Sequence, residues 1–204
     1  MDKFKDVIDF HGHACPGLAL GYRVALCALN QLGDRASDEE LVAVVENNSC
    51  AVDAVQVVTG CTFGKGNLIF KDYGKQVYTF LRRPLQNIRA RKTHGVRISV
   101  KWKPREEKPR EKTMWDRYMK GDRSDEVLET VHERKSNKIN AILNARDDEL
   151  FTVKKESVAL PNEAEILPSI TCESCGEKVM ESRAKVKAGK IVCIPCFNKK
   201  KNER

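Results

Sequence analysis

Two closely spaced cysteine pairs near the end of the chain carry the most specific chemistry in the sequence. Cys172 and Cys175 are two residues apart, and the same spacing recurs seventeen residues later in Cys193 and Cys196. Four thiolates at this spacing are the ligands of a tetrahedral structural zinc site that leaves no coordination position open. The intervening stretch suits a hairpin, so residues 171–204 are expected to form a treble-clef zinc finger ending in a basic helix.

A second cluster of metal-ligating residue types occurs near the start of the chain, in FHGHACPG. In an extended stretch alternate side chains point the same way, so His11, His13 and Cys15 would share one side. Pro16 suits the first position of a helix, whose positive end would favour a thiolate at Cys15. Such a set can hold zinc, iron or nickel with one position free. The alternative is a capped helix with surface histidines.

A third group of candidate residues follows in CAVDAVQVVTGCTFGKGN. On a helix, Cys50, Asp53 and Gln56 would share one face. Asp53 could then orient a histidine that binds a metal. The glycine-rich loop after this helix contains Cys61 and Lys65, and its backbone amides could surround an anion, although the glycines lack the spacing of a Walker P-loop. A plain buried thiol is an equally open interpretation of Cys50 and Cys61.

The elements needed to position these residues can be predicted from apolar periodicity and turn residues. Apolar spacing and short β-branched runs predict two helices and several strands. They are a helix at 16–32, a strand at 41–46, a helix at 50–59, a hairpin of strands at 68–70 and 76–80, and a strand at 96–102. We therefore expect an α+β core with a mixed or antiparallel sheet, within residues 1–160.

Charge is unevenly distributed beyond this core. Residues 82–123 contain fifteen Lys/Arg and five Asp/Glu, whereas residues 124–170 contain six and ten. A repeated Lys-Pro-Arg-Glu motif predicts an extended arm over about 103–123, followed by a helix at about 124–146 and a linker at 161–170. The basic arm could meet the acidic segment of a second copy, which predicts a homodimer.

Composition limits the class of protein and its environment. The 204 residues carry a net charge of +8, and no apolar run approaches the roughly 20 residues that span a membrane. The first ten residues lack the pattern of a secretory signal, so we expect a cytoplasmic protein. Its eight cysteines should then be metal ligands or reactive thiols rather than disulfides. Nucleic acid is a less favoured partner, because Phe197 is the only aromatic residue in the finger.

These blocks together resemble the FmdE family, a group of proteins related to formylmethanofuran dehydrogenase. The resemblance rests on FHGHACPGLALGYRVA, CAVDAVQVVTGCTFGKGNL and the Asp72-Tyr73-Gly74-Lys75 turn, covers roughly residues 5–100, and extends in outline to the finger. It implies a dimeric α+β core with a metal or active site. The implied catalytic residues are His11, His13, Cys15, Asp53, Gln56 and Lys65. The implied metal ligands of the core are His13, Cys15, Cys50 and Cys61.

The family takes its name from a complex that reduces carbon dioxide onto methanofuran with molybdenum or tungsten. The chain resembles no pterin-binding component and has no ferredoxin-type cysteine run, so it is not that whole enzyme. We expect a metal-binding accessory subunit, working with other protein subunits, or a small metalloenzyme of one-carbon or redox metabolism. The alternatives are a zinc-finger regulator that binds nucleic acid or the transcription machinery, and a finger that only reinforces a dimer.

Overall fold

The computed structural model describes residues 3–84, 92–163 and 166–199. The chain divides into two compact units, Met1–Glu163 and Ala164–Arg204. In the described part of the chain, no helix is both long and apolar enough to cross a membrane.

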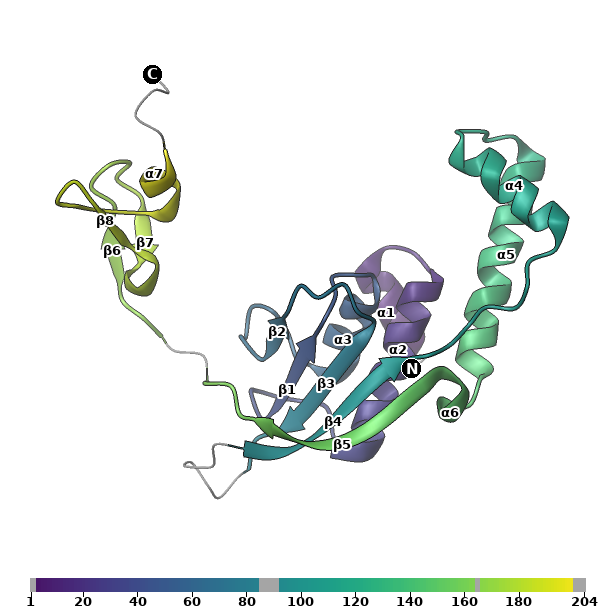
Figure 1. Ribbon diagram of the computed structural model, residues 1–204, viewed down its shortest axis with the longest axis horizontal. Helices are drawn as coiled ribbons and strands as arrows, with labels where there is room; N and C mark the ends of the chain where they lie inside the picture. The colour runs from purple at the N-terminus through teal and green to yellow at the C-terminus, as the bar shows by residue number, and fades with distance from the viewer. Residues whose placement is uncertain (1–2, 85–91, 164–165, 200–204) are drawn as a thin grey trace. The chain divides into compact units, whose positions relative to one another are not determined.

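A five-stranded mixed sheet forms the centre of the first unit (Figure 1). Its strand order is β2-β1-β3-β4-β5, and only the β1–β2 pair is parallel. The strands are β1 (Leu41–Val45), β2 (Leu68–Phe70), β3 (Val77–Arg82), β4 (Lys92–Val100) and β5 (Phe151–Ala159). The expected α+β core with a mixed sheet is thereby confirmed.

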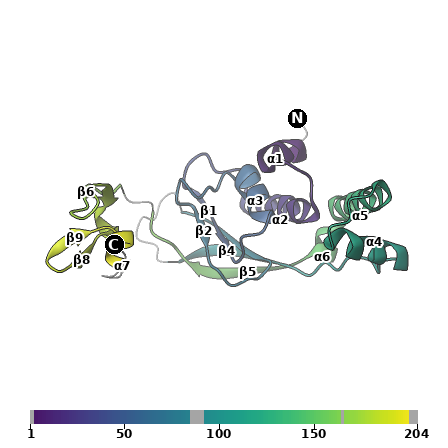
Figure 2. The same cartoon turned by 90° about the horizontal axis from the view of Figure 1, so that it is seen from above.

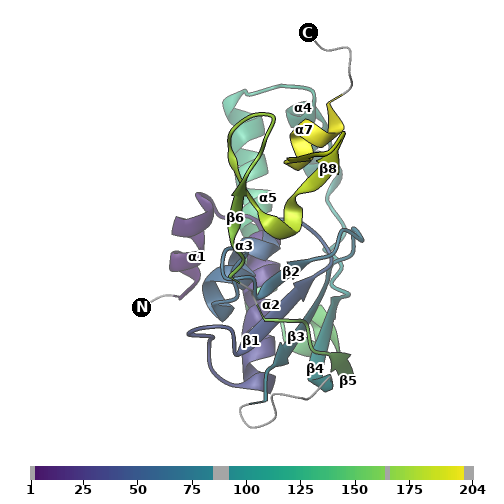
Figure 3. The ribbon, with the colours of Figure 1, turned by 90° about the vertical axis from the view of Figure 1, so that its left-hand side faces the viewer.

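Three helices cover one face of this sheet: α1 (Lys3–His11), α2 (Pro16–Leu32) and α3 (Ala51–Thr59). Figures 2 and 3 show all three on the same side, with α1 outside α2 and α3. A Cβ at Gly21 would lie 2.2 Å from the backbone oxygen of Ala51, so a glycine here lets the α2 and α3 backbones come close together. The helices therefore form a tight layer whose ends lie near one another.

Apolar residues from the helices and the sheet form the main core. The fully buried side chains include Leu41, Tyr78, Phe80 and Ile98 from the strands and Val24 from α2. Helix α2 begins at Pro16 and ends at Leu32, next to Gly33, as the sequence predicts. Strand β1 and helix α3 also lie within a residue of their expected bounds. This close packing holds the first turns of α2 and α3 in fixed positions.

The predicted hairpin of strands 68–70 and 76–80 is wrong. The two strands exist, but β1 lies between them and pairs with both. The loop that joins them crosses the end of β1, where Lys71 N donates to Val45 O at 2.9 Å and Lys75 N donates to Glu46 O at 3.0 Å. Because β1 satisfies these backbone groups, the two strands cannot pair with each other.

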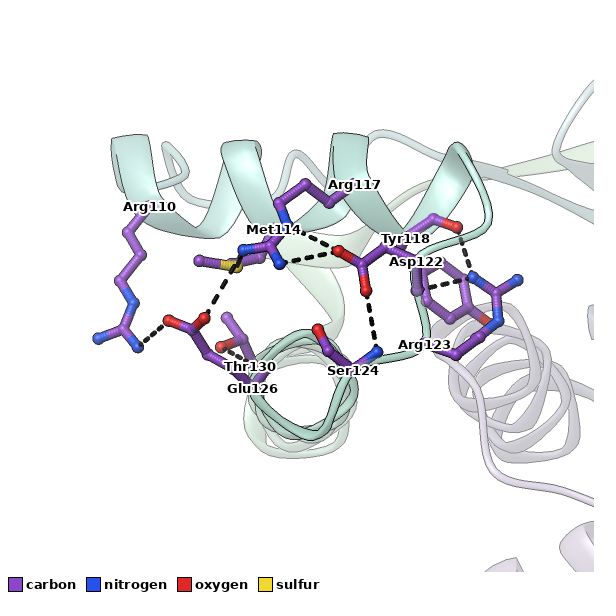
Figure 4. Close-up of polar contacts among 9 residues, drawn as sticks. All are labelled: Arg110, Met114, Arg117, Tyr118, Asp122, Arg123, Ser124, Glu126 and Thr130. Carbon is purple, nitrogen blue, oxygen red and sulfur yellow. Dashed lines mark hydrogen bonds and ion pairs between the residues drawn. The ribbon is translucent and has the colours of Figure 1, made fainter.

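The expected extended arm over 103–123 is only partly correct. Residues Pro109–Met119 form helix α4, which packs against α5 (Asp125–Asn144) through Met114, Val127 and Val131. Figure 4 shows the junction, where Arg117 lies between Asp122 and Glu126. The charged repeat therefore conceals a helix, since most of its charges lie on the exposed surface.

Helix α5 joins the arm to the core, and its end is fixed by α2. Ile139 and Ile142 pack on Ala19, and Arg23 Nη1 donates to Ile142 O at 2.7 Å. A short helix, α6 (Asp147–Leu150), then leads into β5. Ser124 occupies the N-cap of α5 as expected, but its side chain makes no capping hydrogen bond.

The second unit has the order of a knuckle, a hairpin and a short helix. Its elements are β6 (Ser169–Thr171), β7 (Lys178–Met180), the 3-10 turn η1 (Glu181–Arg183), β8 (Lys185–Lys187), β9 (Lys190–Val192) and α7 (Ile194–Asn198). The β8–β9 hairpin turns at Ala188 and Gly189. The basic helix expected at the end begins earlier, at Ile194, and ends at Asn198; residues 200–204 lie outside the described part.

Candidate metal centre

The four cysteines of the finger converge on one point. The sulfurs of Cys172, Cys175, Cys193 and Cys196 all lie within 4.8 Å of one another. The Cys175 and Cys193 sulfurs are 3.8 Å apart, which is about the edge of a tetrahedron of Zn–S bonds of roughly 2.3 Å. Backbone N–H donors, first that of Cys193, lower the pKa of the Cys172 thiol to about 6. This is a four-cysteine structural zinc site.

A second group of ligand-type side chains lies where the three core helices meet. His11 ends α1, Cys15 is the N-cap of α2, and Cys50 is the N-cap of α3. One potential ligand atom from each lies within 4.8 Å of the others. All three residues are partly buried. The helix packing brings together groups that are far apart in the sequence.

Asp53 determines which nitrogen of His11 is free. Asp53 Oδ2 lies 2.6 Å from His11 Nδ1, so this nitrogen is held by the carboxylate. His11 Nε2 is buried and has no hydrogen-bond partner among the described residues. A neutral imidazole that donates from Nδ1 carries its lone pair on Nε2, which is the usual arrangement of a metal-binding histidine.

The two thiols complete a set of one nitrogen and two sulfurs. Leu18 N donates to Cys15 Sγ at 3.3 Å, so the first turn of α2 supports negative charge on that sulfur. Burial raises the pKa of the Cys50 thiol, and the adjacent Cys15 thiol raises it further. A divalent transition metal fits this donor set and would retain at least one coordination position for another ligand.

Gln56 and Lys65, both predicted as site residues, have different surroundings. Gln56 Nε2 donates to the other Asp53 oxygen at 3.5 Å, and its Oε1 accepts from Phe63 N at 3.2 Å. Gln56 therefore helps to position the carboxylate that holds His11. Lys65 Nζ donates to Asp38 O at 3.1 Å, so it is tied to a different loop.

His13 and Cys61, two of the expected core ligands, are not in the converging group. His13 is exposed and its ring lies 4.5 Å from that of His11, between centroids. Cys61 is fully buried, its thiol donates to Leu41 O at 3.3 Å, and burial raises its pKa to about 11. His11 was expected among the catalytic residues but not among the metal ligands.

The expectation of an extended stretch around His11 is wrong. Helix α1 continues to His11 and ends at Gly12, whose φ of 91° turns the chain toward Cys15. The helical spacing of Phe4, Val7 and Ile8 is the signal in the sequence that indicates this helix. His11 then points back along α1 to Asp53, and His13 is left on the turn.

Comparisons with known proteins cover most of the chain. Residues 10–152 match the family described as FmdE, molybdenum formylmethanofuran dehydrogenase operon. Residues 166–202 match the prokaryotic dksA/traR C4-type zinc finger. A protein of Archaeoglobus fulgidus named "Probable S-adenosyl-L-methionine-binding protein" is 33% identical over 199 residues, or 92% of this chain. The match spans 50% of that relative, so the chain corresponds to about half its length.

A solved structure has the same fold. It is an FmdE-like protein of the tungsten formylmethanofuran dehydrogenase type from Syntrophus aciditrophicus, with a TM-score of 0.52 and 18% sequence identity. The similarity covers 95% of this chain and 89% of that one. At this level of identity, the comparison shows a shared fold.

Proposed function

Because the chain belongs to the FmdE family, we propose that its core binds a divalent transition-metal ion through His11, Cys15 and Cys50. The observation that supports this most directly is His11 Nε2, which is buried, unpartnered among the described residues and beside two thiols. A divalent ion at such a site supplies Lewis-acid activation of a bound water or substrate atom. The protein then acts as a metal-dependent accessory subunit or a small metalloenzyme of one-carbon or redox metabolism.

The surrounding residues have positioning roles in this proposal. Asp53 holds the imidazole with Nε2 free, and Gln56 holds Asp53. The Leu18 N–H stabilises charge on Cys15. These contacts come from α2 and α3, whose close packing keeps the three ligands together.

The metal content per chain tests the proposal. Elemental analysis should find two ions in the wild type, one in the finger and one in the core. Cys15→Ser and Cys50→Ser should each retain one ion, whereas the control Cys27→Ala should retain both, because Cys27 is buried in the apolar core. One ion in the wild type and the same number in Cys15→Ser would refute a core site.

Binding of S-adenosyl-L-methionine is a second candidate function. The name of the archaeal relative suggests it, and the aligned half of that relative includes nearly all of this chain. The specific observation in its favour is a cavity of about 590 Å³ between the core helices, within the usual range for small-molecule sites. Equilibrium dialysis of the full chain against labelled S-adenosyl-L-methionine tests this function. No retention at millimolar ligand would exclude it.

A further inference from the structure

The cavity lies at the opposite ends of the helices that carry the proposed metal ligands. It is lined by the first residues of α1 and the last turns of α2 and α3, together with the residues after Gly33. His11, Cys15 and Cys50 lie at the other ends of the same three helices. The cavity is therefore separate from the metal centre.

The floor of the cavity is apolar and its edge is polar. Leu26, Leu29, Val57 and Val58 form the floor. All four are partly or fully buried, so their surfaces are already fixed by packing in the helix layer. An apolar floor of this kind accommodates a flat, weakly polar group such as a nucleobase.

The charged groups at the edge are of both signs. The Asp6 and Asp34 carboxylates and the Lys3 ammonium group have no hydrogen bond or ion pair with other described residues, and Arg35 Nε donates to Val57 O at 3.2 Å. The ends of α2 and α3 add partial negative charge from their last carbonyls. The two carboxylates therefore favour a cation, while Lys3 and Arg35 favour a carboxylate.

The cavity at the base of the arm is different in this respect. It has a volume of about 330 Å³, and its carboxylates are already paired. Glu107 contacts Arg134 and Lys138, and Glu111 contacts Arg105. Its charged groups therefore stabilise the arm, whereas those of the larger cavity are available to a ligand.

We propose that the larger cavity binds a zwitterionic sulfonium nucleoside of the S-adenosyl-L-methionine type. The base lies on the apolar floor, the sulfonium faces Asp6 and Asp34, and the carboxylate faces Lys3 and Arg35. This inference rests on the second candidate function and assigns its site. It implies a preference for S-adenosyl-L-methionine over S-adenosyl-L-homocysteine, which lacks the sulfonium charge.

Isothermal titration of the full chain with both compounds tests the assignment. Wild type should bind S-adenosyl-L-methionine more tightly than the homocysteine form. Asp34→Asn should weaken only the former, by about two- to fivefold, as expected for an exposed charge pair. Asn30→Trp places an indole at the mouth of the cavity and should abolish binding of both. The matched controls Asp116→Asn and Asn140→Trp, which replace exposed residues of α4 and α5, should bind as wild type does.

Each outcome separates this assignment from the proposals on which it stands. Wild-type affinity for S-adenosyl-L-methionine in both Asp34→Asn and Asn30→Trp would overturn the site, even if the protein binds the ligand elsewhere. No binding by wild type would overturn the site and the second candidate function together. Metal content in Asn30→Trp should match that of the wild type, because the cavity and the metal ligands lie at opposite helix ends.

Discussion

Removing the Asp53 carboxylate should weaken metal binding at the core without removing a ligand. In Asp53→Ala the imidazole of His11 loses the acceptor that now lies 2.6 Å from Nδ1. The ring is then free to rotate, and Nε2 is a weaker base. We expect both effects to act on the affinity for the ion and not on the number of ions bound at saturation.

The exposure of Asp53 sets the size of this loss. Loss of the carboxylate partner of a metal-binding histidine typically lowers metal affinity about 10- to 100-fold, or about 1.4–2.8 kcal/mol. The Asp53 side chain is 36% exposed, so water can replace part of its interaction with His11. We therefore expect a loss near the lower limit, about tenfold. Asp53→Asn keeps a neutral acceptor and should lose less.

Competition with a chromophoric chelator measures the affinity for Zn²⁺ in protein whose finger is already loaded. Cobalt absorption then reports whether thiolates still ligate the ion in each variant. Asp9→Ala is the matched control, because Asp9 lies on α1 near His11 but pairs with Lys5. Zinc affinity of Asp53→Ala within twofold of the wild type would refute the role of Asp53. An unchanged affinity in His11→Ala would refute His11 as a ligand.

The finger, the core thiols, the helix contact at Gly21 and the charged arm each give a further prediction. Removing zinc with a chelator should make the finger unit sensitive to protease while the core unit stays resistant; equal resistance with and without zinc would contradict this. In metal-free protein, mass spectrometry should show alkylation of Cys15 near neutral pH and none of Cys27, because burial, followed by the charge of Asp147, raises the pKa of Cys27 to about 11 and its thiol stays protonated below that pH. Bound metal should protect Cys15, and equal reactivity of the two thiols would be evidence against the site. Gly21→Ala should destabilise the core by about 1–3 kcal/mol in urea unfolding, since its Cβ would clash with the α3 backbone, whereas Gly64→Ala meets nothing within 4 Å and should be neutral in that respect. Sedimentation equilibrium should show a homodimer held partly by opposite charges; a monomer at micromolar concentration in moderate salt would contradict it.

Local signals in the sequence account for the parts of the fold that were predicted correctly. Pro16 and the residue after Leu32 mark the ends of α2, and the β-branched run of β1 has no competing interpretation. The Cys-x-x-Cys pairs define the finger because their spacing is itself the geometry of the site. Each of these features depends on residues close together in the chain.

The incorrect or missing predictions concern contacts between distant residues. Strand β5 is largely exposed and contains Lys154, Lys155 and Glu156, so it lacks the apolar alternation of a strand. Its partner β4 precedes it by the whole arm, and no local pattern indicates that pairing. The choice of His11 over His13 as a candidate ligand likewise depends on Asp53, which comes from another helix.

The pairing of β4 with β5 makes the arm an insertion in chain topology. Val100 lies directly opposite Phe151, so the segment 101–150 leaves the sheet and returns to it at neighbouring positions. The entropy of closing such an excursion grows slowly with its length, by about 0.6 kcal/mol for each doubling. The sheet and the helix ends beside it therefore tolerate large changes in the length of this segment. Its tip can diverge, shorten or acquire new contacts while the ends at Val100 and Phe151 preserve the register of the strands.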